Sequence, residues 1–283
     1  MDATTLPAAR LLQGRLEQAL HDQWHELLCQ RQRAQNGCGQ EAIHDLRVAS
    51  RRLRTMIELL APLSSADQLR RLRRPLRRLT RELGQLRNLD EAYHYLTGLQ
   101  DDGLAPLIAQ LAEQRRQERR RIGRLLEELP VKQLHRRLEQ ITQRLNITDT
   151  FGPGGLISRL AERNLVLYRP IHHLLQLPEL AEQAEQRHTL RIAIKKWRYF
   201  SELLAQLWAR RQDRLVALLK LYQGLLGELN DREVFQALVR TTGQLDPQVR
   251  ERVLLAIEAQ HRQLLNDFKL LLTRQPLQYQ LQI

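Results

Sequence analysis

Apolar residues recur every three to four positions along nearly the whole chain, and strand-like alternation is absent. This spacing is typical of amphipathic helices, and glycine and proline gather at only a few places, so the sequence predicts an all-helical protein. We expect helices at about 6–35, 43–61, 66–87, 89–98 and 104–129, then a short one at about 132–146. A second series is expected at about 154–176, 187–208, 211–229, 231–242 and 247–273, with an irregular tail after Pro276.

The chain contains an internal repeat. Residues 44–61, HDLRVASRRLRTMIELLA, return at 188–205 as HTLRIAIKKWRYFSELLA, with nine of eighteen positions identical. A second segment, LGQLRNLDE at 83–91, returns as LGELNDRE at 226–233. Repetition of this kind predicts two similar helical halves. We expect one domain over 1–283, made of a first repeat at 1–130, a connecting segment at 131–155 and a second repeat at 156–283.

The second repeated segment carries a possible helix start. Asn88 and Asn230 are each followed three residues later by a glutamate, which is typical of an N-terminal capping box. We therefore predict that a new helix begins at each asparagine. A metal or catalytic role for the neighbouring Asp90 and Asp231 is the weaker alternative, because no histidine or further carboxylate follows at ligand spacing.

The first repeated segment places its charged residues on one face. On a helix the following residues share an arc of about 80°: His44, Arg47, Arg51, Arg54 and Glu58, and in the second copy His188, Arg191, Lys195, Arg198 and Glu202. Apolar residues occupy the opposite face, which predicts that each helix is buried on that side. A solvated face is the alternative interpretation, but such faces usually mix charges of both signs. Three cations and one histidine against one glutamate instead predict a bound anion.

The densest cluster of arginines lies at 70–81, between the two repeated segments. Its aligned counterpart in the second half keeps few cations, so we expect the first half to bind an anion more strongly. Pro75 lies inside this cluster and is predicted to kink or divide the helix, because proline lacks the backbone N–H. Another basic run at 115–121 is interleaved with glutamates and is interpreted as mostly solvated.

Composition limits the kind of partner. The 283 residues include 45 Lys and Arg against 32 Asp and Glu, a formal net charge of +13, which predicts an acidic partner such as nucleic acid, an anionic membrane surface or another polyanion. No apolar run approaches 18 residues and no leader pattern is recognised, so we expect no membrane partner and a cytoplasmic location. The two cysteines provide neither a disulfide framework nor a CxxC site. Because nucleotide-binding, zinc-ligand and catalytic motifs are not found, we expect no cofactor, no metal and no enzymatic activity.

The repeated motifs resemble a known family. His44-x-x-Arg47-Val48-x-x-Arg51-Arg52-x-Arg54 and its copy from His188 to Tyr199 are similar to the two signature helices of the CHAD family, the conserved-histidine α-helical domain. The LG-x-L segments fit the same family. The resemblance implies two pseudo-symmetric helical bundles packed around a central basic cavity or pore that binds inorganic polyphosphate. It also implies an association with polyphosphate granules and their proteins. The ExExK segment of the catalytic domain that is fused to some members is not found here.

From the residues and the resemblance together we predict a non-enzymatic polyphosphate-binding protein. The predicted phosphate-binding residues are His44, Arg47, Arg51, Arg52, Arg54, Arg74, Arg77, Arg81, His188, Arg191, Lys195, Lys196, Arg198, Tyr199 and Lys220. A nucleic-acid-binding protein is the main alternative, and a phosphate-releasing enzyme is the third hypothesis. Aromatic residues make up only 5% of the chain, which argues against recognition of single strands by base stacking.

Overall fold

The computed structural model describes residues 5–37, 39–59, 66–143, 155–208, 213–243 and 245–278. Within these ranges the chain forms helices and no strand, which confirms the all-helical prediction. The first half contains α1 (Thr5–Gln35), α2 (Gln40–Leu59), α3 (Ala66–Gly98), the short 3₁₀ helix η2 (Asp102–Leu104), α4 (Ala105–Glu127) and α5 (Val131–Gln143). The second half contains α7 (Gly155–Leu175), α8 (Ala184–Trp208), α9 (Asp213–Thr241) and α10 (Pro247–Arg274).

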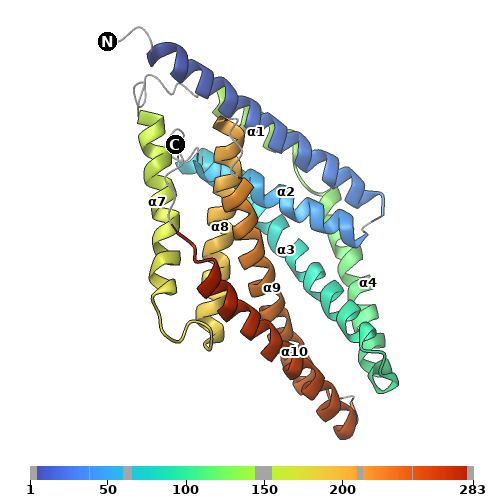
Figure 1. Ribbon diagram of the computed structural model, residues 1–283. Helices are drawn as coiled ribbons and strands as arrows, with labels where there is room; N and C mark the ends of the chain where they lie inside the picture. The colour runs from blue at the N-terminus through green and yellow to red at the C-terminus, as the bar shows by residue number, and fades with distance from the viewer. Residues whose placement is uncertain are drawn as a thin grey trace.

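The helices of each half pack in chain order (Figure 1). In the first half α1 contacts α2, α2 contacts α3, and α3 contacts α4; in the second half α7, α8, α9 and α10 make the same succession of contacts. The two halves meet where α2 packs on α8, with further contacts of α1 to α8 and of α3 to α9. Pseudo-symmetry of the halves, a central pore and the domain division at 131–155 stay predictions. Within that connecting segment, residues 144–154 lie outside the described residues.

Helix α8 contributes to the cores of both halves. Its residues Leu190, Ile194 and Trp197 pack in the core of the second half. Further along the same helix, Phe200 and Leu204 belong to the core formed by α1 to α5. Burial of apolar surface in both cores stabilises the position of α8 against α2, the helix that carries the other copy of its motif.

A third core joins the halves at the ends of α3 and α9, away from the two motifs. Tyr95 of α3 stacks on Phe235 of α9 with ring centroids 4.6 Å apart. Arg252 of α10 donates to Asp101, which precedes η2, at 2.8 Å. A side chain at Gly103 would lie 2.5 Å from a methyl group of Val249, so glycine permits the close approach of η2 and α10.

The predicted helix starts at Asn88 and Asn230 are wrong. Helix α3 continues from Ala66 to Gly98 and α9 from Asp213 to Thr241, so both asparagines lie in helix interiors. Apolar residues at helical spacing continue past both positions and are buried, among them Ala92 and Phe235. Burial of these residues favours continuation of the helix over a local cap.

Pro75 does not divide α3. Because proline has no N–H, the carbonyl of Arg71, four residues earlier, loses its helical donor. Arg137 of α5 donates to this carbonyl through Nη1 at 2.9 Å. A neighbouring helix therefore satisfies the acceptor that the proline leaves, and α3 remains continuous.

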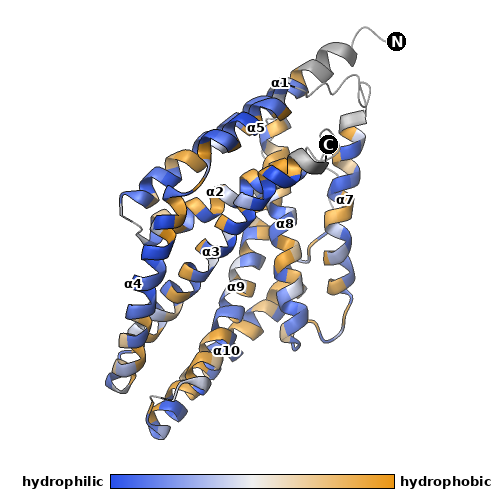
Figure 2. Ribbon diagram, turned by 180° about the vertical axis from the view of Figure 1, so that it is seen from behind, coloured by the Kyte–Doolittle hydropathy of each residue, from blue (hydrophilic) through white to orange (hydrophobic). Residues whose placement is uncertain are grey.

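Hydrophilic residues cover much of α4 in the view of Figure 2. The basic run of this helix is nevertheless not only solvated, because Arg115 and Arg119 reach Asp90 of α3, at 2.7 and 3.4 Å, and Asp90 is fully buried. These ion pairs give the buried carboxylate two cationic partners on α4. In the described ranges, no helix combines the length and apolar character needed to cross a lipid bilayer.

Candidate anion-binding site

The two copies of the motif meet across a cavity of about 350 Å³ between α2 and α8. Side chains from both helices line it: Arg47, Arg51, Arg54, Thr55 and Glu58 of α2, and His188, Arg191, Ile192, Lys195, Lys196 and Tyr199 of α8. The cavity therefore brings together eight of the residues predicted to bind phosphate.

Helical spacing explains why the cations converge. The opposite faces of the two helices are apolar and fully buried, for example at Leu46 and Leu53 of α2 and at Leu190 and Trp197 of α8. Because these faces must point into the cores, the cationic faces point away from them. Since α2 and α8 also pack on each other, the two cationic faces share one cavity.

Several donors in this cavity have no acceptor. The Nε atoms of Arg47, Arg51, Arg54 and Arg191 are buried, and no described residue accepts a hydrogen bond from them. Buried donors of this kind are costly, because each loses its bonds to water without replacement. Four such atoms around one cavity form a group of donors suited to acceptor oxygens.

The electrostatics of the cavity point to the same conclusion. Burial, followed by the charge of Arg51, lowers the pKa of Arg47 to about 10. Burial, followed by neighbouring arginine charges of which Arg191 contributes most, lowers the pKa of Lys195 to about 6. Burial is also the largest cause of the lowered pKa of Arg54 and of Arg191. A bound anion would relieve the repulsion that disfavours these charges.

The glutamate of each motif forms ion pairs with arginine side chains. Glu58 accepts from Arg73 of α3 at 3.0 Å. Glu202 accepts from Arg198 at 2.7 Å and lies 3.5 Å from Arg52 of α2. Both carboxylates therefore have cationic partners other than the four cavity arginines.

Helix α9 holds one end of the site. The Oδ1 atom of Asn230 lies 3.0 Å from Nδ1 of His188 and accepts from Nη2 of Arg191 at 3.2 Å. The charge of Asp231 favours the cationic forms of Arg191 and Lys195. Asn230 is thus a positioning residue for both side chains.

Sequence reasoning missed some of these residues as part of the site. They are Asn230, Asp231, Thr55, Ile192 and Arg87 of α3, whose charge lowers the pKa values of His44 and Arg47. The repeated LG-x-L segments were the available signal, since Arg87, Asn230 and Asp231 all lie in them.

The other predicted site residues lie outside the cavity lining. Arg52 and Arg198 form the ion pairs with Glu202, and Arg52 lines a neighbouring cavity of about 250 Å³. Tyr199, one of the eight residues that line the cavity between α2 and α8, also lines this neighbouring cavity. His44 is exposed, and burial of part of its ring followed by the charge of Arg87 lowers its pKa. Four further cations lie exposed on α3 and α9: Arg74, Arg77, Arg81 and Lys220.

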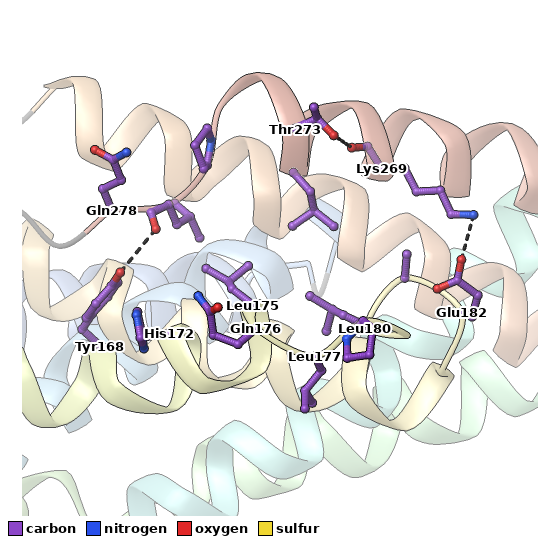
Figure 3. Close-up of a pocket in the computed structure, with 15 residues that line it drawn as sticks. Tyr168, His172, Leu175, Gln176, Leu177, Leu180, Glu182, Lys269, Thr273 and Gln278 are labelled. Atoms are coloured by element: carbon purple, nitrogen blue, oxygen red, sulfur yellow. Dashed lines mark hydrogen bonds and ion pairs between the residues drawn. The ribbon is translucent and has the colours of Figure 1, made fainter.

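A larger pocket, of about 640 Å³, lies between the ends of α7 and α10 (Figure 3). Its cation Lys269 is paired with Glu182 at 2.8 Å. At the other end, Tyr168 donates to the carbonyl of Leu277 at 3.3 Å. Because its charges are balanced, this pocket lacks the unpaired cations that distinguish the cavity between α2 and α8.

Comparisons with known proteins agree with this architecture. The family model of the CHAD domain matches residues 18–240. The crystal structure of the CHAD domain from the plant Ricinus communis is similar, with 22% identity and a TM-score of 0.68, over 93% of this chain and 92% of that one. PptA from Streptomyces chartreusis is 17% identical with a TM-score of 0.60, over 93% and 98% of the two chains.

At these identities the two solved structures are evidence of a shared fold alone, and no protein with a curated description matches the sequence. The family assignment depends on the match to the family model, which spans most of the residues and includes both motif helices. This chain belongs to the CHAD family.

Proposed function

We propose that the protein binds inorganic polyphosphate in the cavity between α2 and α8 and does not catalyse a reaction on it. The observation that carries the proposal is the set of four buried arginine Nε atoms without acceptors around one cavity. Phosphate oxygens match this need, because guanidinium groups form paired, charge-assisted hydrogen bonds with them. The CHAD resemblance supports the same ligand.

The size of the cavity favours a thin polyanion. A cavity of about 350 Å³ accommodates a short stretch of a phosphate chain. A DNA duplex, whose major groove alone is about 12 Å wide, is too thick to enter it. Tyr199 is the aromatic residue of the lining, and single-strand binding proteins usually stack successive bases on several aromatic rings.

A binding role fits the chemistry of the lining better than a catalytic one. Apart from Glu58, which is paired with Arg73, the charged side chains that converge are cations, which hold phosphate oxygens without breaking a bond to phosphorus. We further propose that binding places the protein at polyphosphate granules. Metal-dependent release of orthophosphate by the purified protein would contradict the non-catalytic part of the proposal.

The test is to measure the affinity of the protein for long-chain polyphosphate at about physiological salt. Salt weakens the binding of phosphates by arginine, so binding must be measured at this concentration to be meaningful. The double variant R51E/K195E removes two charge-assisted contacts of about 1.5–3 kcal/mol each, so we expect at least about a hundredfold loss of affinity. The control R120E/R214E changes the net charge equally at exposed positions that do not line the cavity. Equal losses in both variants would refute the assignment of the site.

Nucleic acid is the second candidate, and one observation favours it. Arginines on the exposed face of α3 form a basic surface outside the cavity, and they include Arg74, Arg77 and Arg78. A surface of this kind binds phosphate backbones without entering a cavity. If this candidate is correct, duplex DNA displaces polyphosphate, and the substitution R74E/R77E weakens binding more than R51E/K195E does.

A further inference from the structure

Lys195 lines the cavity and, unlike the adjacent Lys196, is partly buried. Among the residues that the structure describes, none forms a hydrogen bond or an ion pair with its amine. The charged residues that shift the pKa of this amine lie on three helices: Arg47 and Arg51 on α2, Arg191 on α8 itself and Asp231 on α9. Three cations against one carboxylate disfavour a fourth positive charge.

The other helices that pack on α8 contact different sides of it. Asn164 of α7 accepts a hydrogen bond from the ring of Trp197, and Arg15 of α1 donates to the carbonyl of Leu207. The charged groups that act on the amine of Lys195 are therefore the three arginines and Asp231. Lysine loses its proton far more readily than arginine does, so the repulsion is relieved at this residue.

An uncharged amine is a nucleophile, and desolvation among other cations is a known way to obtain one. The pKa of about 6, which burial lowers from the ordinary lysine value, leaves most of this amine uncharged at pH 7. The surrounding arginines would at the same time hold a phosphate group beside it. The cavity therefore combines an anion site with a reactive nitrogen.

We propose that Lys195 is a site of covalent acylation by acyl phosphates, which the cavity arginines bind through the phosphate group. The proposal rests on the phosphate affinity assigned to the cavity under the proposed function. The arginines select this class of acyl donor because its leaving group is the anion that they bind.

The reaction balances without another reactant. The amine nitrogen attacks the acyl carbon and forms a C–N bond, and the bond from that carbon to the phosphate oxygen breaks. Orthophosphate leaves with the bonding electron pair and takes up the proton from nitrogen. The product is an amide, which carries no charge at any pH near neutrality. A bound polyanion would favour protonation of the free amine, so acylation removes a positive charge that the complex would otherwise have. The added acyl group also narrows the cavity.

Lys196 provides the matched control, because it follows Lys195 in the same helix and is exposed. The purified protein is treated with acetyl phosphate at pH 7, and acetylation of each lysine is followed over time by peptide mass spectrometry. We expect Lys195 to react at least about tenfold faster than Lys196, since only the uncharged amine attacks. Added orthophosphate or polyphosphate should slow the reaction at Lys195 and not at Lys132, which is exposed on α5 and does not line the cavity.

The uncharged reagent N-hydroxysuccinimidyl acetate has no phosphate group. It therefore reports the intrinsic reactivity of each amine, without binding of the reagent by the arginines. With this reagent the preference for Lys195 should fall, because the arginines have no phosphate to hold. A preference that is absent with acetyl phosphate, or that orthophosphate does not reduce, overturns the proposal. Loss of polyphosphate affinity after acetyl phosphate treatment should occur in the wild type and not in K195R, which keeps a cation that is not acylated.

The same preparation distinguishes failure of this proposal from failure of the proposed function. Tight polyphosphate binding with no preferential acetylation of Lys195 refutes the acylation site and leaves the binding function standing. Preferential, phosphate-protected acetylation in a protein that does not bind polyphosphate supports the acylation site and refutes polyphosphate as the ligand.

Discussion

Polyphosphate affinity should depend on pH through Lys195. Burial and the neighbouring arginines lower the pKa of this amine to about 6, so the protein without ligand holds it uncharged above that pH. A polyanion in the cavity favours the charged amine and returns its pKa towards the ordinary value of about 10.4. Binding between these two pH values therefore takes up one proton.

The sign and the size of the effect follow from this proton. Affinity is greatest below pH 6, where the amine is already charged, and it falls as the pH rises through the window from 6 towards 10. One proton per ligand gives a slope that approaches tenfold per pH unit, so affinity should fall roughly 50-fold between pH 6.5 and 8.5. Long-chain polyphosphate suits the measurement because its internal phosphates do not titrate in this range.

Titration calorimetry or fluorescence anisotropy at several pH values and constant ionic strength measures the slope. The variant K195R keeps a permanent cation and should bind with little of this dependence, whereas K195Q should bind more weakly at low pH and also lose the slope. Both variants retain the histidines, so the difference from the wild type isolates Lys195. Equal slopes in the wild type and K195R would refute the argument.

Two further predictions concern residues that support the site. The substitution N230A removes the acceptor that holds His188 and Arg191, so we expect polyphosphate affinity to fall about fivefold, the effect of about 1 kcal/mol, with unchanged circular dichroism. The substitution N164L leaves the ring nitrogen of Trp197, which donates to Asn164 at 2.7 Å, buried without an acceptor. We expect the free energy of unfolding in urea to fall by about 1–3 kcal/mol, and an unchanged midpoint would contradict this role.

The main cationic residues of the site could be predicted from local pattern alone. Arg47, Arg51 and Arg54 share a face because of helical spacing, and so do Arg191 and Lys195. The apolar residues on the opposite faces determine which way the cations point. The repeat supplied a second copy of the same face, and α2 and α8, which carry the two copies, pack on each other.

The local sequence pattern could not predict which ion pairs form between helices. The motif places Glu58 and Glu202 with the cations, but no local rule gives Arg73 and Arg52 as their partners from other helices. The asparagines of the LG-x-L segments were interpreted as caps because Asn-x-x-Glu spacing is also the capping signature. Tertiary packing kept both helices continuous, and Asn230 instead holds side chains of α8.

The repeat gives the physical reason to expect that the proposed site is sensitive to protons. Arg51 and Lys195 occupy equivalent positions in the two copies of the motif, since each lies seven residues after the histidine. Both line the cavity, and the charge of Arg51 lowers the pKa of Lys195. Two arginines at these positions would both remain charged whether or not a ligand is present, because guanidinium does not release its proton near neutral pH. With lysine in one copy, the empty cavity releases one proton and lowers its own repulsion, and the charge returns when an anion binds. If the proposed function is correct, the exchange of arginine for lysine at this position couples ligand binding to proton uptake, and it also leaves an uncharged amine in the empty site.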